Sequence, residues 1–331
     1  MKDNHPLVSI VTPSYNQAQF IRQTIDSVLK QSYPFVEYWV IDGGSTDGTQ
    51  DILREYEKDP RFHWLSEKDE GQADAVNKGW RLSKGEVLGW LNSDDLYTPG
   101  AIQSAVKELL SHPETVFVYS DIEIVDENGE HPQHYRGGQA CASDQMLLAC
   151  SIPQQSVFLT RESFEKTGGL RVDLHYVLDQ ELWLRVLQSG TAVYVPHKVW
   201  AKQRVHSSAK TQAEWHRLHT EWWKIVNENL ANENIPAPIR EEAIRRASLN
   251  NFVVNLYKGN YVEGSQSLNL ALSGGYPFGN ISDSVRYTTY AVRHWCGKER
   301  AGELLAKFAR EVEESQDVGL LPIVGLLNSY N

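Results

Sequence analysis

The chain has 331 residues, 41% of them hydrophobic and 23% charged, which is typical of a globular protein with a sizeable core. Its 32 basic and 43 acidic residues give a net charge of −11, which excludes a protein that binds nucleic acid through a basic face. The 3 cysteines include no CxxC pair, so a disulfide framework and a cysteine-built zinc site are excluded and a reducing compartment is indicated. No apolar run approaches the roughly 18 residues of a membrane span. We therefore expect a soluble, cytoplasmic protein.

The first part of the chain alternates strand-like and helix-like segments. Apolar, β-branched runs predict strands at 7–15, 36–41, 62–65, 86–91 and 116–119. Helical periodicity and helix-start signals predict helices at 21–29, at 47–56 with Asp47 and Gln50 as a capping box, at 72–82 and after Pro99. Repeated strand–helix–strand units predict an α/β fold: a mostly parallel sheet with helices on both faces.

Beyond residue 120 the pattern changes. Asn128 and Gly129 predict a hairpin turn between a strand at 122–125 and the segment around Tyr135. The next part predicts strands at 156–159, 192–195 and 199–205, with a helix at 179–188. From residue 212 onward the chain has a helical pattern. We therefore predict two domains, 1–212 and 213–331.

Three polar segments follow three of the predicted strands: residues 12–16, 42–48 and 92–95. In open α/β sheets, ligands bind outside the carboxyl ends of the strands, so these segments predict the site. The glycines of 42–48, Gly44 among them, let the backbone approach a ligand, although a plain turn with a helix cap fits equally well. The phosphate-binding patterns GxGxxG and GxxxxGK[ST] are absent, which removes the main support for a dehydrogenase or a P-loop NTPase.

Asp94 and Asp95 are adjacent carboxylates directly after a predicted buried strand. Such a pair needs a cation or hydrogen-bond donors to offset the mutual repulsion. Mg²⁺ and Mn²⁺ take oxygen ligands from one or two carboxylates and from substrate phosphates. The pair therefore predicts a divalent-metal site, with a solvated turn that caps the next helix as the alternative.

Four motifs together resemble a family 2 glycosyltransferase of the GT-A fold, over about residues 6–210: IDGGSTDGT (41–49), SEKDEGQADAVNKG (66–79), WLNSDD (90–95) and DQELWLR (179–185). The resemblance implies transfer of a sugar, with inversion, from a nucleotide diphosphate donor to an acceptor hydroxyl. It implies a UDP-sugar as donor, Mn²⁺ or Mg²⁺ as cofactor, and a carbohydrate or lipid-linked glycan as acceptor. Surface polysaccharide or glycan assembly is the family's commonest role.

The resemblance also implies roles for single residues. Asp42 matches the carboxylate that reads the donor base. The other implied donor contacts are Thr12, Pro13, Tyr15, Gly44, Gln72, Asp74, Asn77, Lys78, Ser93 and Asp94. Asp94 and Asp95 match the metal motif, which the sequence does not resolve further, and Asn92 stands where the first Asp of that motif is usual. His206 matches a position for a metal ligand or a diphosphate contact.

Asp179 resembles the catalytic base, the one carboxylate needed to take the acceptor proton. Glu181 competes for this role, but residues i and i+2 of a helix face different directions, so we expect Glu181 to be a solvated charge. Trp183 and Arg185 are expected to serve packing and a local ion pair.

Several expectations concern the surroundings of the site. Lys202, Arg204 and Lys210 are candidates for pyrophosphate contact. The pair 154–155 resembles the loop between donor and acceptor sites, with a structural turn as the alternative. Residues 1–213 carry 20 basic and 29 acidic side chains, net −9, and an acidic domain attracts a diphosphate poorly. Donor binding is therefore expected to depend on the divalent cation.

Two other functions stay open. A sugar-nucleotide-forming nucleotidyltransferase has a related sheet, but its glycine-rich basic loop is replaced here by residues 12–17 (TPSYNQ). A non-catalytic sugar-nucleotide-binding protein is the second alternative. The tryptophans and basic residues of 215–226 fit either peripheral membrane contact or packing inside the chain's own helical domain.

Overall fold

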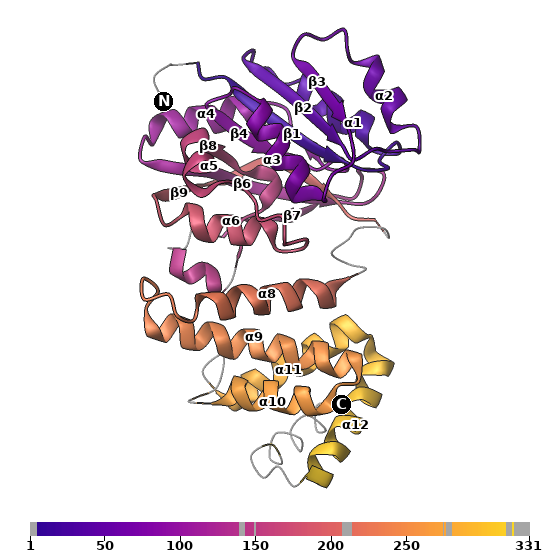
Figure 1. Cartoon of the computed structure of the whole chain (residues 1–331), viewed down its shortest axis with the longest axis vertical. Coiled ribbons are helices and arrows are strands. Elements are labelled where there is room, and N and C mark those ends of the chain that lie inside the picture. Colours follow the sequence, from indigo (N-terminus) through magenta and orange to yellow (C-terminus); the bar gives the residue numbers. More distant parts are fainter. Residues whose placement is uncertain are drawn as a thin grey trace. The chain divides into compact units, whose positions relative to one another are not determined.

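The computed structural model describes residues 5–138, 143–148, 150–206, 214–273, 275, 280–315 and 320. It divides into two compact units, Met1–Ala209 and Lys210–Asn331, coloured from indigo to yellow along the chain in Figure 1. The predicted domain division after residue 212 lies outside the described residues and stays a prediction.

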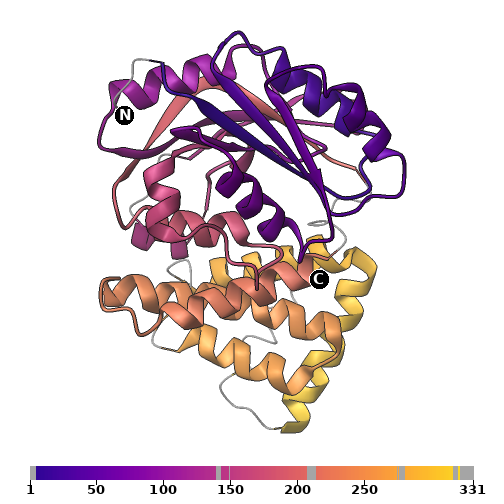
Figure 2. The same ribbon diagram turned by 45° about the horizontal axis from the view of Figure 1, so that its top comes forward.

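The first unit is built on one sheet with the strand order β3-β2-β1-β4-β8-β6-β9-β5, and β7 pairs with β6. Figure 2 shows the twist of its strands. Its strands are β1 (Val8–Ser14), β2 (Val36–Asp42), β3 (Phe62–Ser66), β4 (Val87–Trp90), β5 (Leu96–Tyr97), β6 (Thr115–Val125), β7 (Gln133–Tyr135), β8 (Phe158–Thr160) and β9 (Thr191–Arg204). Strands β3, β2, β1 and β4 are parallel, and β9 is parallel to β6. β8 is antiparallel to both β4 and β6. The predicted mostly parallel α/β sheet is confirmed.

Helices cover both faces of this sheet. They are α1 (Ile21–Leu29), α2 (Thr49–Glu55), α3 (Gln72–Leu82), α4 (Ala101–Ser111), α5 (Arg161–Thr167) and α6 (Leu178–Val186), with short 3-10 turns at Ser143–Leu147 and Gln154–Ser156. On one face, Ile25 of α1 and Ile102 of α4 share a core with Ile10. The next strand residue, Val11, points to the opposite face and meets α3, where a Cβ on Gly79 would lie 2.5 Å from its side chain. The alternation of β1 thus places one helix layer on each side.

Two helices, α2 and α5, differ from the predictions. Helix α2 begins at Thr49 after the left-handed Gly48, so Asp47 and Gln50 do not form the predicted capping box. Instead, Asp47 Oδ1 accepts from the Thr49 N–H at 3.0 Å, and the Gln50 amide donates to the carbonyl of Ser45. Helix α5 was not predicted.

The later strands agree with the sequence pattern except in one place. The hairpin at Asn128–Gly129 is confirmed, since β6 and β7 pair antiparallel on either side of it. The two strands predicted at 192–195 and 199–205 form a single strand, β9. Its register against β6 shifts near Asp121, and His197 has a φ of 61°, which explains why the sequence pattern is interrupted.

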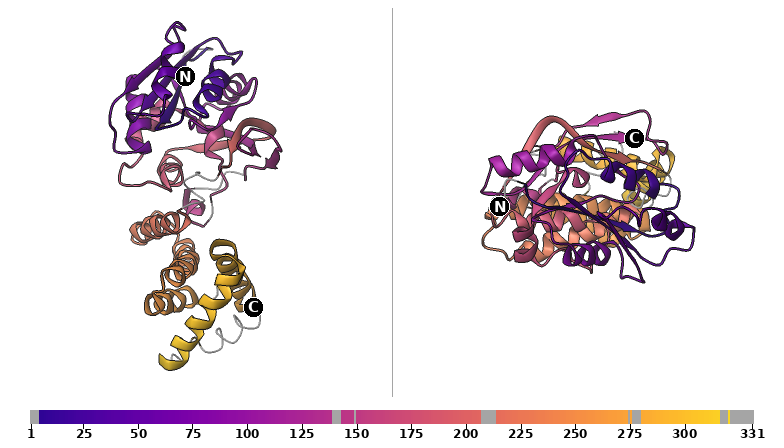
Figure 3. Two further views of the ribbon diagram at one scale, coloured as in Figure 1. Left: turned by 90° about the vertical axis from the view of Figure 1, so that its right-hand side faces the viewer. Right: turned by 90° about the horizontal axis from the view of Figure 1, so that it is seen from above.

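The second unit is helical, as predicted. Its helices are α8 (Trp215–Asn229), α9 (Ala237–Lys258), α10 (Tyr261–Leu272), α11 (Ile281–Cys296) and α12 (Lys298–Ser315). In the left view of Figure 3, α8, α9 and α10 are seen nearly end-on and the yellow α12 crosses obliquely. Trp215 is buried and stacks on Trp295 at 5.3 Å between ring centres, so at this position packing accounts for the tryptophan. Among the described residues, no helix is long and apolar enough to cross a membrane.

Candidate active site

The polar segments after β1, β2 and β4 lie together at the carboxyl edge of the sheet, as predicted. The backbone N–H of Asn16 donates to Ser45 Oγ at 2.7 Å, and the Thr46 N–H donates to Asn16 Oδ1 at 3.0 Å. The amide of Gln72 donates to Asn92 Oδ1 at 2.8 Å, which ties the start of α3 to the segment after β4. One edge therefore carries every predicted donor-binding segment.

Asp42 is fully buried, and both of its oxygens are engaged within the protein. Oδ2 accepts from the N–H groups of Gly44 and Ser45 and from Ser66 Oγ, at 3.2, 2.9 and 2.6 Å. Oδ1 accepts from Ser45 Oγ. This carboxylate orders its own loop, and its contact with a donor base stays a prediction.

The segment after β1 presents Tyr15 and Asn16 to solvent. Thr12 is buried, and its hydroxyl accepts from the Tyr38 hydroxyl at 3.0 Å; Pro13 is buried as well. Tyr15, by contrast, is 63% exposed and offers a free ring face. Gly44 has a φ of 84°, a conformation that other residues adopt only with strain.

The residues of helix α3 that were predicted to contact the donor lie partly at the surface and partly in the interior. Lys78 forms an ion pair with Glu67 at 2.6 Å and lies 3.9 Å from Asp74. Asn77 is buried, and its amide both donates to and accepts from the backbone of Leu170, at 2.7 and 2.8 Å. Asn77 therefore joins two parts of the chain, a role that the sequence did not indicate.

Asn92 is the centre of the segment after β4. Its Oδ1 accepts from Gln72 and from Trp90 Nε1, and its Nδ2 donates to Asp95 at 3.1 Å and to Gln154 at 3.3 Å. An aspartate here has no N–H to donate and adds a third carboxylate. The departure from the usual motif is thus explained by the structure.

Asp94 and Asp95, which the sequence left unresolved, differ in their surroundings. Asp95 is buried and accepts from the Arg204 N–H at 3.0 Å, and burial together with Asp94 raises the pKa of its carboxyl well above the usual range. Asp94 is partly exposed, and its Oδ2 lies 3.0 Å from His206 Nε2. Ser93 is buried, with its carbonyl bonded to the Thr24 hydroxyl at 2.8 Å.

The side chains of Asp94 and His206 are the groups that could hold a divalent ion here. Across the described part of the chain, no group of three or more His, Cys, Asp or Glu side chains is placed to hold a metal. The Asp94 carboxylate fits Mn²⁺ or Mg²⁺ when donor phosphates and water complete the shell, whereas the imidazole nitrogen of His206 fits the transition ion Mn²⁺ better than Mg²⁺. The donor set thus suits an ion that binds together with a diphosphate.

Basic residues of β9 already have partners. Lys202 forms an ion pair with Glu123 at 3.2 Å. The Arg204 guanidinium is buried 4.7 Å above the Phe20 ring and donates to Gln23 at 2.6 Å. Lys210 lies outside the described residues. Arg204 Nε and Nη1 are buried without a hydrogen-bond partner among the described residues, and pyrophosphate contact by Lys202 and Arg204 stays a prediction.

The pair Gln154–Gln155 is also held inside the protein. The Gln154 amide donates to the carbonyl of Trp90 at 2.7 Å, and Gln155 is a hydrogen-bond donor to Asp95. The alternative of a structural turn is therefore favoured, since Gln154–Ser156 forms one 3-10 turn.

Asp179 is the second residue of α6. Burial raises the pKa of its carboxyl to about 6, although the N–H groups of Gln180 and of Asp179 itself oppose the shift. A general base is most effective when its pKa lies near the working pH. The raised pKa of Asp179 is consistent with the predicted base, and that role stays a prediction.

Glu181 is not the solvated charge that we expected. It is buried, and its carboxylate forms a two-pronged ion pair with Arg185. The ion pair and the packing role predicted for Arg185 and Trp183 are confirmed. The error arose because helix position alone does not reveal that a neighbouring loop covers this face.

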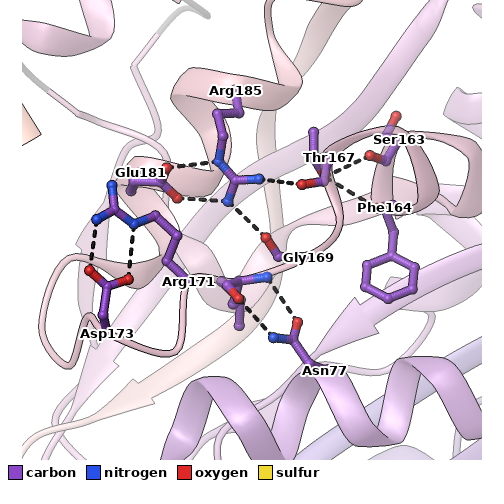
Figure 4. A network of polar contacts seen from close by, with 10 residues as sticks. Asn77, Ser163, Phe164, Thr167, Gly169, Arg171, Asp173, Glu181 and Arg185 are labelled. Atoms are coloured by element: carbon purple, nitrogen blue, oxygen red, sulfur yellow. Dashed lines mark hydrogen bonds and ion pairs between the residues drawn. The ribbon is translucent and has the colours of Figure 1, made fainter. Parts of the chain in front are cut away.

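That loop connects α5 to the segment before α6 (Figure 4). Arg185 donates to the carbonyls of Thr167 and Gly169, both at 2.7 Å. A Cβ on Gly169 would lie 2.3 Å from Asn77 Oδ1, so the close approach of α3 requires glycine. Through these contacts α3 and α6 are held at fixed positions relative to each other.

Residues 9–177 match the family model described as Glycosyl transferase family 2. The chain belongs to glycosyl transferase family 2. It is 29% identical to the putative teichuronic acid biosynthesis glycosyltransferase TuaG of Bacillus subtilis over 66% of this chain and 86% of that protein. This agrees with the resemblance carried by the four motifs, and the chain is a glycosyltransferase.

Two solved structures show the same fold. The S. aureus TarS 1-349 complex with UDP-GlcNAc aligns with a TM-score of 0.62 at 16% identity, covering 98% of this chain and 91% of that one. The Pyrobaculum calidifontis mannosyltransferase PcManGT, solved with GDP-Man and Mn²⁺, aligns with a TM-score of 0.56 at 18% identity over 97% and 85%. The GT-A fold predicted for this family 2 enzyme is confirmed.

Proposed function

We propose that this glycosyltransferase moves a sugar, with inversion, from a UDP-sugar to an acceptor hydroxyl during surface polysaccharide or glycan assembly. The observation that carries the proposal is the Asp179 carboxyl, whose pKa is raised by burial. Asp179 lies on α6, and the segment before α6 is bonded to Asn77 of α3, the helix that borders the donor segments. The name of TuaG supports a polysaccharide product, and the UDP-GlcNAc bound to TarS supports a uridine donor.

On the donor side, the exposed Tyr15 ring would stack on the base, and Gly44 would let the backbone approach the ligand. Asp94 and His206 would hold Mn²⁺ or Mg²⁺, which supplies charge neutralisation to the departing diphosphate. Asp95 accepts hydrogen bonds from the Arg204 N–H and the Asn92 amide. These bonds would hold the segment so that the carboxylate of Asp94 faces the ion.

On the acceptor side, Asp179 would take the proton of the attacking hydroxyl as the bond between the sugar and the diphosphate breaks. Attack comes from the face opposite the leaving group, through a transition state with oxocarbenium character. A single base is sufficient because the acceptor oxygen itself is the nucleophile. The acceptor would be a carbohydrate or a lipid-linked glycan, met at the cytoplasmic face of a membrane.

The test is a screen of UDP-, GDP- and dTDP-sugars with Mn²⁺, first for thermal stabilisation and then for slow donor hydrolysis and transfer. Asp179→Asn should bind UDP like wild type and lose transfer. The matched control is Asp173→Asn, an exposed carboxylate on the loop before α6 that pairs with Arg171. Full transfer by Asp179→Asn would remove Asp179 from the mechanism.

This screen and two further assays separate the alternatives. Formation of a sugar nucleotide from an NTP and a sugar 1-phosphate would identify a nucleotidyltransferase. Binding of nucleotide and Mn²⁺ without hydrolysis or transfer would identify a binding protein. Deletion of residues 213–331 with unchanged vesicle association would contradict membrane contact through the helical region.

A further inference from the structure

One face of helix α11 carries rings and charges that the core of the second unit does not use. The aliphatic side chains of this helix, Val285, Ala291 and Val292 among them, are buried in that core. The opposite face, which we call the α11 stripe, recurs at helical spacing and consists of Arg286, Tyr287, Tyr290, Arg293 and His294. The α11 stripe is therefore aromatic and basic, and it contains no aliphatic side chain.

The rings of the α11 stripe are accessible and held in place. Tyr290 is 64% exposed and Tyr287 is 36% exposed. The Tyr290 ring lies nearly parallel to the His294 ring, with 5.7 Å between their centres and 12° between their planes. The Tyr287 hydroxyl donates to Asn250 Oδ1 of α9 at 3.1 Å, and His294 packs edge-on against Trp295 at 4.6 Å. A partner would meet rings whose rotamers are already restricted, which lowers the entropic cost of binding.

This part of the surface is basic in an acidic chain. Residues 283–300 include four basic and two acidic side chains, net +2, whereas the whole chain has a net charge of −11. Arg286 pairs with Asp283 at 2.8 Å, and the two side chains are 73% and 41% exposed. Because such a surface pair contributes little to stability, the guanidinium can exchange this carboxylate for one on a ligand. The charge of the α11 stripe thus favours an anionic partner.

The composition of the α11 stripe decides between anionic partners. A helix that lies on a membrane buries an apolar face in the lipid, but the aliphatic side chains of α11 point into the core of the unit. A glycan with carboxylates fits better, because a tyrosine ring can cover the apolar face of a sugar and the planar guanidinium of arginine binds a carboxylate through two hydrogen bonds. Side chains three or four residues apart on a helix are about 5–6 Å from each other, which is close to the length of one sugar unit.

We propose that the α11 stripe binds an acidic glycan, a polysaccharide whose sugars carry carboxylates. This deepens the proposed function and rests on it, because the ligand would be the acceptor polysaccharide or its extended product. All five side chains come from the second unit. They would hold the glycan without taking part in the transfer of the sugar.

Calorimetry on the full chain tests this with three probes: an oligogalacturonate, a neutral maltooligosaccharide of the same length, and vesicles that contain phosphatidylglycerol. We expect wild type to bind the oligogalacturonate more tightly than the neutral probe, with an affinity that falls as salt is added. Tyr290→Ala and Arg286→Ala should each weaken this binding by on the order of tenfold. Both side chains lie at the surface, so thermal unfolding should match that of wild type.

The second unit offers a matched control for each variant. Arg217→Ala removes an arginine from another exposed pair of the same helical spacing, Arg217 with Glu214 at 3.2 Å on α8. Val262→Ala shortens a side chain of α10 that is 65% exposed, close to the exposure of Tyr290. Both controls should bind the oligogalacturonate as wild type does.

Equal or absent binding of the acidic and neutral probes, or binding that Tyr290→Ala and Arg286→Ala leave unchanged, would overturn the inference while leaving the proposed function in place. Vesicle binding that is lost in Tyr290→Ala would assign the α11 stripe to a membrane surface and would overturn the inference as well. A chain that binds the oligogalacturonate through the α11 stripe but transfers sugar to no acceptor would overturn the proposed function alone.

Discussion

Glu181 and Arg185, one turn apart on α6, form a two-pronged ion pair with both N–O distances at 2.7 Å. Arg185 also donates to the carbonyls of Thr167 and Gly169. The ion pair therefore connects α6, which bears Asp179, to the loop whose Leu170 is bonded to Asn77. Glu181 neutralises a guanidinium that would otherwise be brought against this loop without a counterion.

Arg185→Ala should destabilise the protein by about 3 kcal/mol, because it leaves a buried carboxylate and two carbonyl groups without a donor. Urea-induced unfolding measures this. Arg22→Ala is the control: the Arg22–Glu55 pair has the same two-pronged geometry but both side chains are about half exposed, and its loss should cost less than about 1 kcal/mol. Equal losses in the two variants would show that the α6 pair has no special structural role.

The activity of the enzyme should rise with pH through about 6, since the Asp179 carboxyl must lose its proton to act as a base. The profile of kcat/KM against pH measures this limb. A limb near 4, the pKa of an unperturbed aspartate, would mean that the burial of Asp179 does not persist in the working enzyme.

The same shift has a consequence for stability. A carboxyl whose pKa is raised by folding favours the folded state while protonated, so its contribution is present below about pH 4 and is lost as pH rises through about 6. Asp179→Asn should therefore be more stable than wild type at neutral pH, on the order of 1–3 kcal/mol, while inactive. Thermal unfolding at pH 4 and pH 7.5 checks this, because the gain should vanish at the lower pH.

Metal-dependent UDP binding should weaken by about tenfold or more in Asp94→Asn and in His206→Asn, because each removes one of two protein ligands. Calorimetry with Mn²⁺, and after EDTA treatment, measures the effect. His112→Asn, on an exposed histidine that follows α4, is expected to bind as wild type does. Tight UDP binding after EDTA would contradict both the metal site and the expectation from the acidity of residues 1–213.

Asn92→Asp restores the carboxylate usual in the motif and should nevertheless damage this enzyme. It removes the donors to Asp95 and Gln154 and places a new charge beside a buried carboxyl. We expect a loss of about 1–3 kcal/mol in unfolding free energy, with weaker donor binding. A variant as stable and active as wild type would show that Asn92 has no structural purpose.

The order of strands and helices in 7–120 could be predicted from the sequence, because each segment has its own periodicity and its own turn residues. The gathering of three polar segments at one edge followed from the parallel sheet. The single strand β9 could not be predicted, since its irregular pairing near His197 interrupts the alternation on which strand prediction depends.

The fine structure of the site depended on contacts between residues distant in sequence. Nothing local indicates that Asn77 bonds to Leu170, 93 residues away, or that a loop buries Glu181. Sequence patterns predicted which segments meet at one edge of the sheet, whereas the contacts of the individual residues follow from packing.

The two hydrogen bonds between Asn77 and Leu170 divide the chain after α5 into parts with different tolerance to length changes. A residue inserted after Leu170 and before Asp179 lies between two fixed points, Leu170 and α6, and is accommodated by a bulge in the loop. A residue inserted before Gly169 instead displaces Leu170 from its hydrogen bonds with Asn77. Segment 171–177 is therefore the place where loop length can change while the bonds that join α3 to Leu170 stay intact.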